Sequence, residues 1–278
     1  MAKRKVTYPI AHWSYSSLMS FLRNPLAWHK RYVDHVHDMP SSPAGVIGRA
    51  AHVALQHFYS GLGKEAAIAL GLEHLKNVAD FEINFGVSKS RRAQKARRAL
   101  MEKELLQALS YYLARPPRYE VLGVETALVA SVPGIPLPIK AISDLVVVSK
   151  VDPRGVDIVD HKFIDSFSPY GADNPLFILQ AIFNYYTVAS EFKRPVRRFI
   201  LQECKKRKNK SGASQMRRTV LEYGALRAEF ELFKRLLNDA SEEIARKRVY
   251  LPNPSDMFEG KNSFDIYRLE LLEGRIDD

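Results

Sequence analysis

The amino-acid sequence predicts an α+β protein, in which a mixed central sheet is flanked by helices and the N-terminal half is helical. Three observations predict this class. Residues 1–115 show mainly helical periodicity of apolar side chains. Three runs rich in β-branched residues follow and are separated by turn sequences. A helical stretch at 175–192 and a further β-like run at 196–204 then complete the pattern. With 278 residues, the chain is long enough for one large domain with a helical annex.

The N-terminal half is predicted to contain five helices. Ser-Tyr-Ser-Ser at 14–17 offers N-caps to the first helix, and Asn24-Pro25 supplies the cap and first-turn residues of the second. The other three are predicted over residues 46–59, 64–81 and 88–114.

The strands of the second half are predicted over residues 119–132, 137–149 and 155–164. Pro133-Gly134 and the sequence Asp-Pro-Arg-Gly at 152–155 supply the turns between them. We therefore expect a single domain over 1–278, with a helical portion, a sheet portion, a basic loop, and a C-terminal helix with a tail. These parts are predicted at 1–115, 116–204, 205–218 and 219–278, with the last helix ending near residue 248.

Composition narrows the classes of protein and of site. The chain carries 42 Lys and Arg residues against 31 Asp and Glu residues, a net charge of +11. This surplus favours a polyanionic partner such as nucleic acid, although a generally basic protein would also show it. Cys204 is the single cysteine, which excludes an internal disulfide and a four-cysteine metal site. No apolar run reaches the length of a membrane span, and no signal-peptide pattern is present, so we expect a cytoplasmic protein.

Strand periodicity places three charged residues together. In the strand at 155–164, Asp160 and Lys162 project to the same face because side chains alternate along a strand. Asp144 interrupts an otherwise apolar face of the preceding strand, which is costly unless the carboxylate is paired or binds metal. If the two strands are neighbours, both carboxylates converge on one cation. The alternative is a buried Asp–Lys ion pair in an ordinary sheet.

This arrangement suits phosphodiester hydrolysis. Carboxylates hold a hard divalent cation, and such a cation makes a bound water acidic enough to supply hydroxide near neutral pH. A neighbouring lysine can orient the water and stabilise the developing negative charge.

Three further features accompany the pattern. Gly48 and His52 lie four residues apart on one helix face, although a core histidine on a glycine-packed helix would give the same sequence. Gln180 is a polar residue on an apolar helix, where the alternative is one buried amide. Glu125 adds a carboxylate on the first strand as a candidate accessory residue, and simple solvent exposure is its alternative.

In this order, these features resemble the PD-(D/E)XK nucleases of the RecB type, the group with the nuclease domain of bacterial RecB, the CRISPR adaptation nucleases and the mitochondrial genome maintenance exonuclease. The resemblance covers nearly the whole chain, from the opening helix SYSSLMSFLRNPLAWHKRYV through the G-x-x-x-H helix at 48–52 to the glutamine helix. It implies an α/β/α core of the restriction-endonuclease-like type.

The resemblance also implies roles for individual residues. His52, Asp144 and Asp160 would be ligands of Mg²⁺ or Mn²⁺, together with the backbone carbonyl of His161. Lys162 would be the catalytic lysine, and Gln180 would face the DNA or support the site. The expected activity is that of an exonuclease on single-stranded DNA or DNA ends, in recombination, repair or phage DNA processing. The alternatives are a structure-specific or restriction-like endonuclease and a catalytically silent DNA-binding module.

Two departures from the family pattern are visible. The family tyrosine stands four residues after the glutamine, whereas this chain has Asn184 there and the tyrosines follow at 185 and 186. The cysteines that hold an iron–sulfur cluster in many relatives are absent, so we expect no cluster. Packing of tail residues against the N-terminal helices is expected instead, through Met257, Phe258, Phe264 and Tyr267.

Basic residues and one tyrosine are the candidate DNA contacts: Arg49, Arg91, Lys95, Arg98, Tyr185, Lys206 and Arg207. A solvated helix face and a disordered connection are the alternatives for the helix at 88–114 and the loop at 205–218. A zinc site at His29, His35 and His37 is a weaker alternative, because no cysteine supports it. A recombination or helicase protein is a candidate partner, and a bacterial, archaeal or phage-infected cell is the expected setting.

Overall fold

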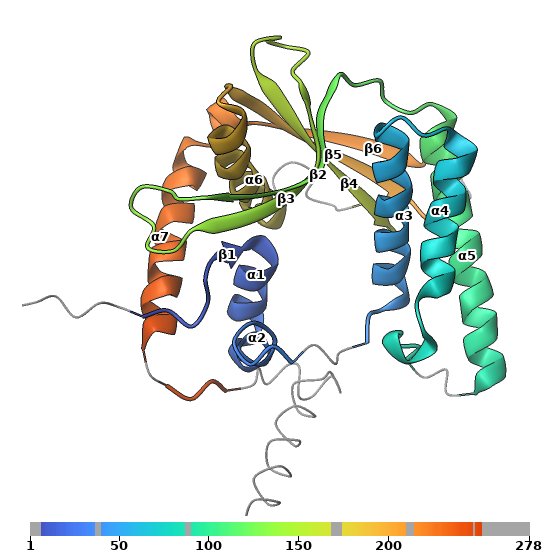
Figure 1. Cartoon of the computed structure of the whole chain (residues 1–278), viewed down its shortest axis with the longest axis horizontal. Coiled ribbons are helices and arrows are strands. Elements are labelled where there is room, and N and C mark those ends of the chain that lie inside the picture. The colour runs from blue at the N-terminus through green and yellow to red at the C-terminus, as the bar shows by residue number, and fades with distance from the viewer. Residues whose placement is uncertain are drawn as a thin grey trace, which may run out of the picture. The chain divides into compact units, whose positions relative to one another are not determined.

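The computed structural model describes residues 7–36, 40–86, 90–167, 174–209, 214–246 and 248–251. Within these residues the chain forms seven α-helices and a six-stranded mixed sheet (Figure 1). The predicted α+β class is therefore confirmed. The chain separates into two compact units. One comprises Met1–Met39, Val129–Ala141 and Ala228–Asp278, and the other comprises Pro40–Leu128 and Ile142–Arg227.

The sheet combines parallel and antiparallel pairing. Its order is β1-β3-β4-β5-β6, and β2 also pairs with β3. β3 and β4 are antiparallel neighbours, β4 and β5 are parallel, and β5 and β6 form an antiparallel pair. The parallel pair needs a crossover, which α6 supplies. The strands are β1 (Trp13–Ser14), β2 (Val121–Ala130), β3 (Ile139–Val148), β4 (Val156–Ile164), β5 (Val196–Lys205) and β6 (Met216–Glu222).

The first unit has an aromatic core. Trp13 and Trp28 stack with their ring centroids 5.9 Å apart, and Phe21 packs edge-on against Trp28 at 5.0 Å. Tyr250 also packs edge-on against Trp28 at 5.7 Å, and the indole N–H of Trp13 donates to Ser241 Oγ. The helices of this unit are α1 (Tyr15–Arg23), α2 (Pro25–Tyr32) and α7 (Arg227–Ala245), whose first residue belongs to the second unit. As predicted, Ser14 caps α1 and Asn24 caps α2, through bonds to the N–H groups of Ser17 and Ala27.

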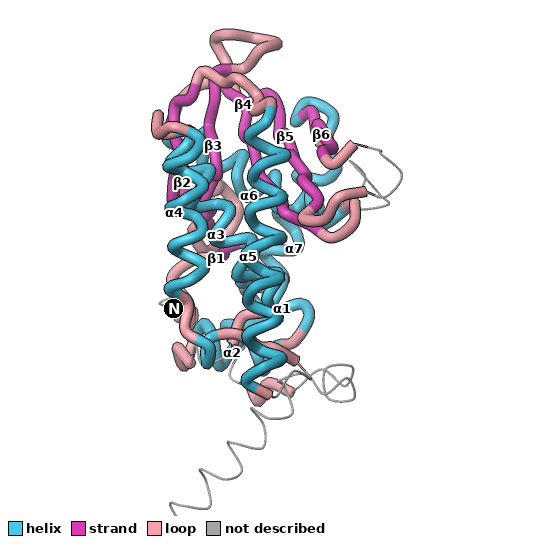
Figure 2. Tube along the Cα trace, turned by 90° about the vertical axis from the view of Figure 1, so that its right-hand side faces the viewer, coloured by secondary structure: helices cyan, strands magenta, loops and turns pink. Residues whose placement is uncertain are grey.

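Three helices of the second unit stand side by side (Figures 1 and 2). They are α3 (Pro43–Tyr59), α4 (Lys64–Asn77) and α5 (Arg91–Ala114). Gly71 on α4 lets this helix approach α3, because a Cβ there would lie 2.7 Å from the carbonyl oxygen of Ala50. The buried side chains of these helices form one cluster with Phe163 and Cys204 of the sheet. The fourth helix, α6 (Pro175–Phe192), starts at the cap residue Asn174.

The predicted C-terminal helix from residue 219 was wrong at its start, because Met216–Glu222 is strand β6 and the helix is Arg227–Ala245. The strand forms because β5 offers it an antiparallel partner, which outweighs the local helical pattern. In that register Arg217 lies opposite Glu203 and donates to its carboxylate at 2.6 Å. The predicted basic loop therefore overlaps the ends of two strands. The tail residues Met257, Phe258, Phe264 and Tyr267 lie outside the described residues.

Among the helices of the described residues, none combines the length and the apolar character that a membrane crossing requires.

Candidate active site

Two adjacent strands bring Asp144 and Asp160 together. The antiparallel register pairs Leu145 of β3 with Val159 of β4. Asp144 precedes Leu145 and Asp160 follows Val159, so the two aspartates lie next to each other on neighbouring strands. Asp144 is 9% exposed and Asp160 is 4% exposed, which makes both carboxylates costly unless they are compensated. The backbone N–H of His161 donates to Asp144 Oδ2 at 2.6 Å. The predicted convergence of the two strands is present.

His52, Glu125 and Asp144 form a cluster of candidate metal ligands. His52 comes from α3, Glu125 from β2 and Asp144 from β3. Nδ1 of His52 lies 3.4 Å from Glu125 Oε1 and 3.4 Å from Asp144 Oδ1. One donor atom from each residue falls within 4.8 Å of the others. Two carboxylate oxygens and one imidazole nitrogen, already converged, are a donor set that fits a divalent cation.

The charges of this cluster depend on one another. Burial opposes ionisation of Asp144, but the adjacent His52 outweighs burial and lowers the pKa of Asp144 to about 2. Burial likewise opposes a charged His52, yet the Asp144 and Glu125 carboxylates raise the pKa of His52 to about 10. Without a cation, the positive charge beside these carboxylates is therefore that of the His52 imidazolium.

Asp160 belongs to a second group, with Lys162 and Gln180. Lys162 Nζ lies 2.8 Å from Asp160 Oδ2 and donates to Oδ1 at 3.0 Å. Gln180 of α6 donates its side-chain N–H to Asp160 Oδ1 at 2.6 Å. Burial raises the pKa of Asp160, and the Lys162 ammonium acts in the opposite direction. The strand periodicity that put Asp160 beside Lys162 is confirmed, and the glutamine reaches the same carboxylate.

The ring of His161 is anchored on the opposite face of β4. It stacks on Tyr59 with ring centroids 5.8 Å apart and an interplanar angle of 3°. Its Nδ1 lies 3.1 Å from the hydroxyl of Tyr112, which is 3.0 Å from the hydroxyl of Tyr59. Tyr59 donates to the carbonyl of Pro117, so the chain is satisfied when His161 donates to Tyr112 and Tyr112 donates to Tyr59. Burial lowers the pKa of His161 to about 4, so this ring is uncharged at neutral pH.

Glu125 has an unusual backbone. Its φ is 46°, in the left-handed region that non-glycine residues rarely adopt, although it lies inside strand β2. The turn of the chain there also crowds Gly123, where a Cβ would lie 2.6 Å from Thr126 Oγ1. From the sequence, Glu125 is expected only as an accessory residue. The glycine two positions earlier inside a strand was the signal that could have indicated this local distortion.

Asn184 and Tyr185 are the other polar candidates on α6, and both contact neighbouring side chains. Asn184, at the position of the family tyrosine, is buried and accepts a hydrogen bond of 2.7 Å from Ser143 of β3. Tyr185 is half-buried and packs against Tyr223 at 4.9 Å and Tyr186 at 5.5 Å. Its role as a DNA contact stays a prediction.

The predicted DNA-contacting cations differ in their surroundings. Arg49, Arg91 and Lys95 are exposed. Arg98 instead ties α5 to the end of α4, because it bonds Asp80 at 2.5 Å and the carbonyls of Leu75 and Val78. Arg207 is 60% exposed and donates to the buried Glu104. The placement of Lys206 on an exposed basic loop was wrong, because this side chain is 2% exposed and pairs with Asp165 at 3.1 Å.

The surroundings of Gly48 and His52 test the alternative of a core histidine on a glycine-packed helix. A Cβ at Gly48 would meet no heavy atom within 4 Å, so this glycine does not serve close helix packing. The imidazole of His52 is 29% exposed and faces carboxylates rather than apolar side chains. The core-histidine alternative therefore does not describe this residue. The weaker zinc alternative finds His29 beside Asp34 at 3.3 Å, while His37 lies outside the described residues.

A comparison with known protein families identifies the family of the chain. A family model described as the PD-(D/E)XK nuclease superfamily matches residues 12–257. No curated protein matches the chain. The chain is also similar to the crystal structure of SSO0001, at 13% sequence identity and a TM-score of 0.29, over 81% of this chain and 82% of that one. Since the family match spans most of the sequence, the chain belongs to the PD-(D/E)XK nuclease superfamily.

Proposed function

We propose that this protein is a Mg²⁺- or Mn²⁺-dependent deoxyribonuclease that acts as an exonuclease on single-stranded DNA or DNA ends. The observation that supports it most is the convergence of His52, Glu125 and Asp144 within 4.8 Å, beside the paired Asp160 and Lys162. The net charge of +11 agrees with a polyanionic substrate. Recombination, repair or phage DNA processing in the cytoplasm is the proposed setting, with a helicase or recombination protein as a candidate partner and no iron–sulfur cluster.

One set of residues would bind the cation, and another would contact the phosphate or the attacking water. His52, Glu125 and Asp144 would hold the cation, and Asp160 with the backbone carbonyl of His161 are further candidate ligands. A divalent cation in such a site supplies charge for the phosphate and lowers the pKa of a coordinated water.

Lys162 and Gln180 both bond the carboxylate of Asp160. The Asp160 carboxylate fixes Lys162 Nζ at 2.8 Å. From there the ammonium can donate to a phosphate oxygen or to the attacking water. Gln180 Nε2 holds Asp160 Oδ1, so the carboxylate that positions the lysine is itself fixed from α6.

The test is Mg²⁺-dependent degradation of linear single-stranded DNA by the full chain and by Asp160→Asn. The variant should lose at least about a hundredfold in rate while its thermal unfolding stays cooperative. Asp239→Asn, at a position on α7 with 70% of its side chain exposed, is the matched control and should degrade DNA like the parent. Full activity in Asp160→Asn contradicts the assignment of the site. A covalently closed single-stranded circle separates the two modes of cleavage, because cutting of the circle identifies an endonuclease.

A further inference from the structure

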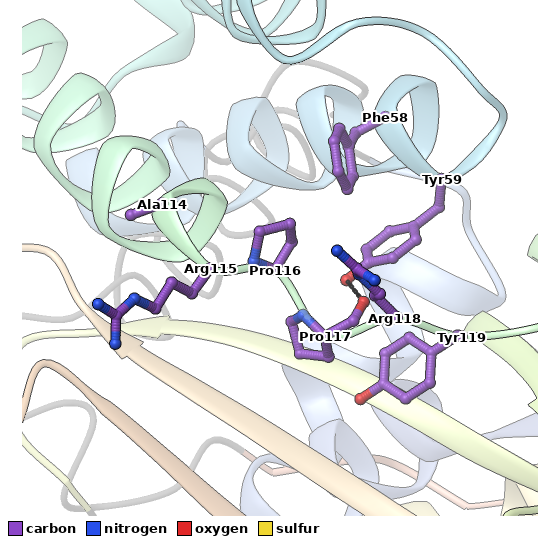
Figure 3. Close-up of a pocket in the computed structure, with 8 residues that line it drawn as sticks. All are labelled: Phe58, Tyr59, Ala114, Arg115, Pro116, Pro117, Arg118 and Tyr119. Atoms are coloured by element: carbon purple, nitrogen blue, oxygen red, sulfur yellow. Dashed lines mark hydrogen bonds between the residues drawn. The ribbon is translucent and has the colours of Figure 1, made fainter.

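A hollow next to the candidate active site combines aromatic and basic side chains (Figure 3). Its volume is about 730 Å³, and it lies between the end of α3 and the connection from α5 to β2. A smaller hollow of about 180 Å³ shares Pro117 and Tyr119 with it and continues onto the sheet. We call the two together the aromatic groove. Its functional side chains are Phe58, Tyr59, Arg115, Arg118, Tyr119, Lys150 and Arg218.

The aromatic rings of the groove form a continuous row. Phe58 and Tyr59 pack edge to face at 5.1 Å, and Tyr59 lies 6.0 Å from Tyr119. Gln202 donates to the hydroxyl of Tyr119 at 3.0 Å, which fixes that ring against the sheet. All three rings are half-buried, so each keeps some surface open to a ligand. Fixed, partly open rings in a row are suited to stacking with planar groups.

The cations around these rings have no carboxylate partner among the described residues. Arg115, Arg118, Lys150 and Arg218 are exposed, and none forms an ion pair with a carboxylate that the structure describes. Lys150 Nζ stands 5.8 Å from the centroid of the Tyr119 ring. The groove carboxylate, Asp157, is buried and already held by Arg198 through two bonds, at 2.6 and 3.1 Å. The groove therefore offers positive charge to a ligand with negative groups.

Helix α3 connects the groove to the metal-ligand cluster. Tyr59 follows His52 by seven residues on α3, which is two helical turns on the same face and about 10 Å along the axis. The Tyr59 ring also stacks on His161, whose backbone N–H bonds Asp144. The row of rings is therefore linked to the metal-ligand cluster through α3 and through His161, from the face of β4 opposite Asp160 and Lys162.

We propose that the aromatic groove binds the unpaired strand of a single-stranded DNA substrate, with bases stacked on Tyr59 and Tyr119 and phosphates at Arg118 and Lys150. This inference rests on the proposed function and assigns its substrate a binding surface. Unpaired bases can stack on aromatic side chains, whereas duplex bases stack on each other and leave such rings unused. A base on Tyr119 brings its phosphate close to the ammonium that already stands over this ring.

The test measures binding of a fluorescein-labelled 15-nucleotide oligothymidylate by anisotropy, in the full chain carrying Asp160→Asn so that the DNA stays intact. Adding R118E and K150E should weaken binding at least about tenfold and reduce the salt slope by about 1.4, because two phosphate contacts are lost. The matched control R92E with K103E reverses two exposed cations on α5 and should bind within about twofold of the background.

The stacking part has its own pair of variants. Tyr119→Leu should weaken oligothymidylate binding about tenfold, while Tyr119→Phe keeps the ring and should bind like the background. Thermal unfolding of both variants checks that the sheet is intact. Equal losses in Tyr119→Phe and Tyr119→Leu would show that the ring does not stack.

The outcomes separate this proposal from the proposed function. If the parent chain degrades DNA with Mg²⁺ but R118E with K150E binds oligothymidylate as tightly as R92E with K103E, the groove is wrong and the nuclease assignment stands. A blunt hairpin duplex that loses as much affinity as the oligothymidylate would also overturn the preference for an unpaired strand. A parent chain without Mg²⁺-dependent cleavage instead contradicts the nuclease assignment itself.

Discussion

Asp144 Oδ2 accepts a 2.6 Å hydrogen bond from the backbone N–H of His161. This bond joins β3 to β4 at the point where a cation would be bound, and it leaves Oδ1 directed at His52, 3.4 Å away. Asp144 therefore serves two purposes, since one oxygen fixes the strand that carries Asp160 and Lys162 and the other is available as a ligand.

Metal binding should release a proton from His52. With a pKa of about 10, the imidazole is protonated at pH 7, and a histidine must be neutral to bind a metal ion. We expect release of about one proton per Mn²⁺ at pH 7, and an affinity that rises by up to about tenfold for each pH unit below 10. Calorimetry in buffers of different ionisation enthalpy measures the proton count.

The stability of the metal-free protein should show the opposite trend. The folded pKa of His52 lies above its ordinary value, so the pairing with Asp144 contributes fully below about pH 6.5 and is lost as the pH rises towards 10. In His52→Gln, both the proton release and this loss of stability should be absent. An unchanged proton count in that variant would assign the proton to another group.

Glu125→Gly should separate stability from metal binding. A residue other than glycine at φ 46° costs about 1 kcal/mol or more, so glycine should leave the free energy of unfolding unchanged or higher. Mn²⁺ affinity should fall by at least about tenfold, because one carboxylate of the cluster is lost. Thermal unfolding and calorimetry measure the two quantities. A variant that loses stability but keeps its affinity would show that Glu125 has a structural role only.

Strand periodicity was enough to predict half of the candidate site. Because side chains alternate along a strand, Asp160 and Lys162 had to share a face, and the short turn at 152–155 made β3 and β4 antiparallel neighbours. His52 and Gln180 were placed by helical periodicity and by the family resemblance, and both lie within 3.5 Å of a carboxylate of the site.

The features that the sequence did not predict depend on contacts between distant parts of the chain. Glu125 joins the cluster only because the backbone of β2 departs from strand geometry at that residue. The burial of Lys206 follows from its pairing with Asp165, which lies 41 residues away in the sequence. β6 exists because β5 offers it hydrogen bonds. Periodicity reports local preference, so it carries no information on any of these three.

Lys162→Ala should lose turnover and keep metal binding. The ammonium is fixed by Asp160 and is not a ligand, so Mn²⁺ affinity should stay within about threefold of the parent. The rate constant for cleavage should fall by about 10²–10³, since one positioned donor at the phosphate is removed. Single-turnover kinetics at saturating Mn²⁺ measure this rate. A variant that recovers its full rate when more Mn²⁺ is added would instead make Lys162 a determinant of metal binding.

Tyr112→Phe tests whether the ring of His161 positions the site. The substitution removes the hydroxyl that bonds His161 Nδ1 at 3.1 Å and Tyr59 at 3.0 Å, in a buried region. The free energy of unfolding should fall by about 1–2 kcal/mol, because buried hydrogen-bonding groups lose their partner. If the ring holds the backbone that bonds Asp144, the cleavage rate should also fall by about tenfold, with little change in DNA affinity.

Tyr111→Phe, at the adjacent half-buried residue of the same helix, should leave both quantities close to the parent. A Tyr112→Phe protein that is less stable but cleaves at the parent rate would restrict the network of Tyr59, Tyr112 and His161 to folding. A loss of rate in that variant alone would instead connect the tyrosines on α3 and α5 to the strand that carries Asp160 and Lys162.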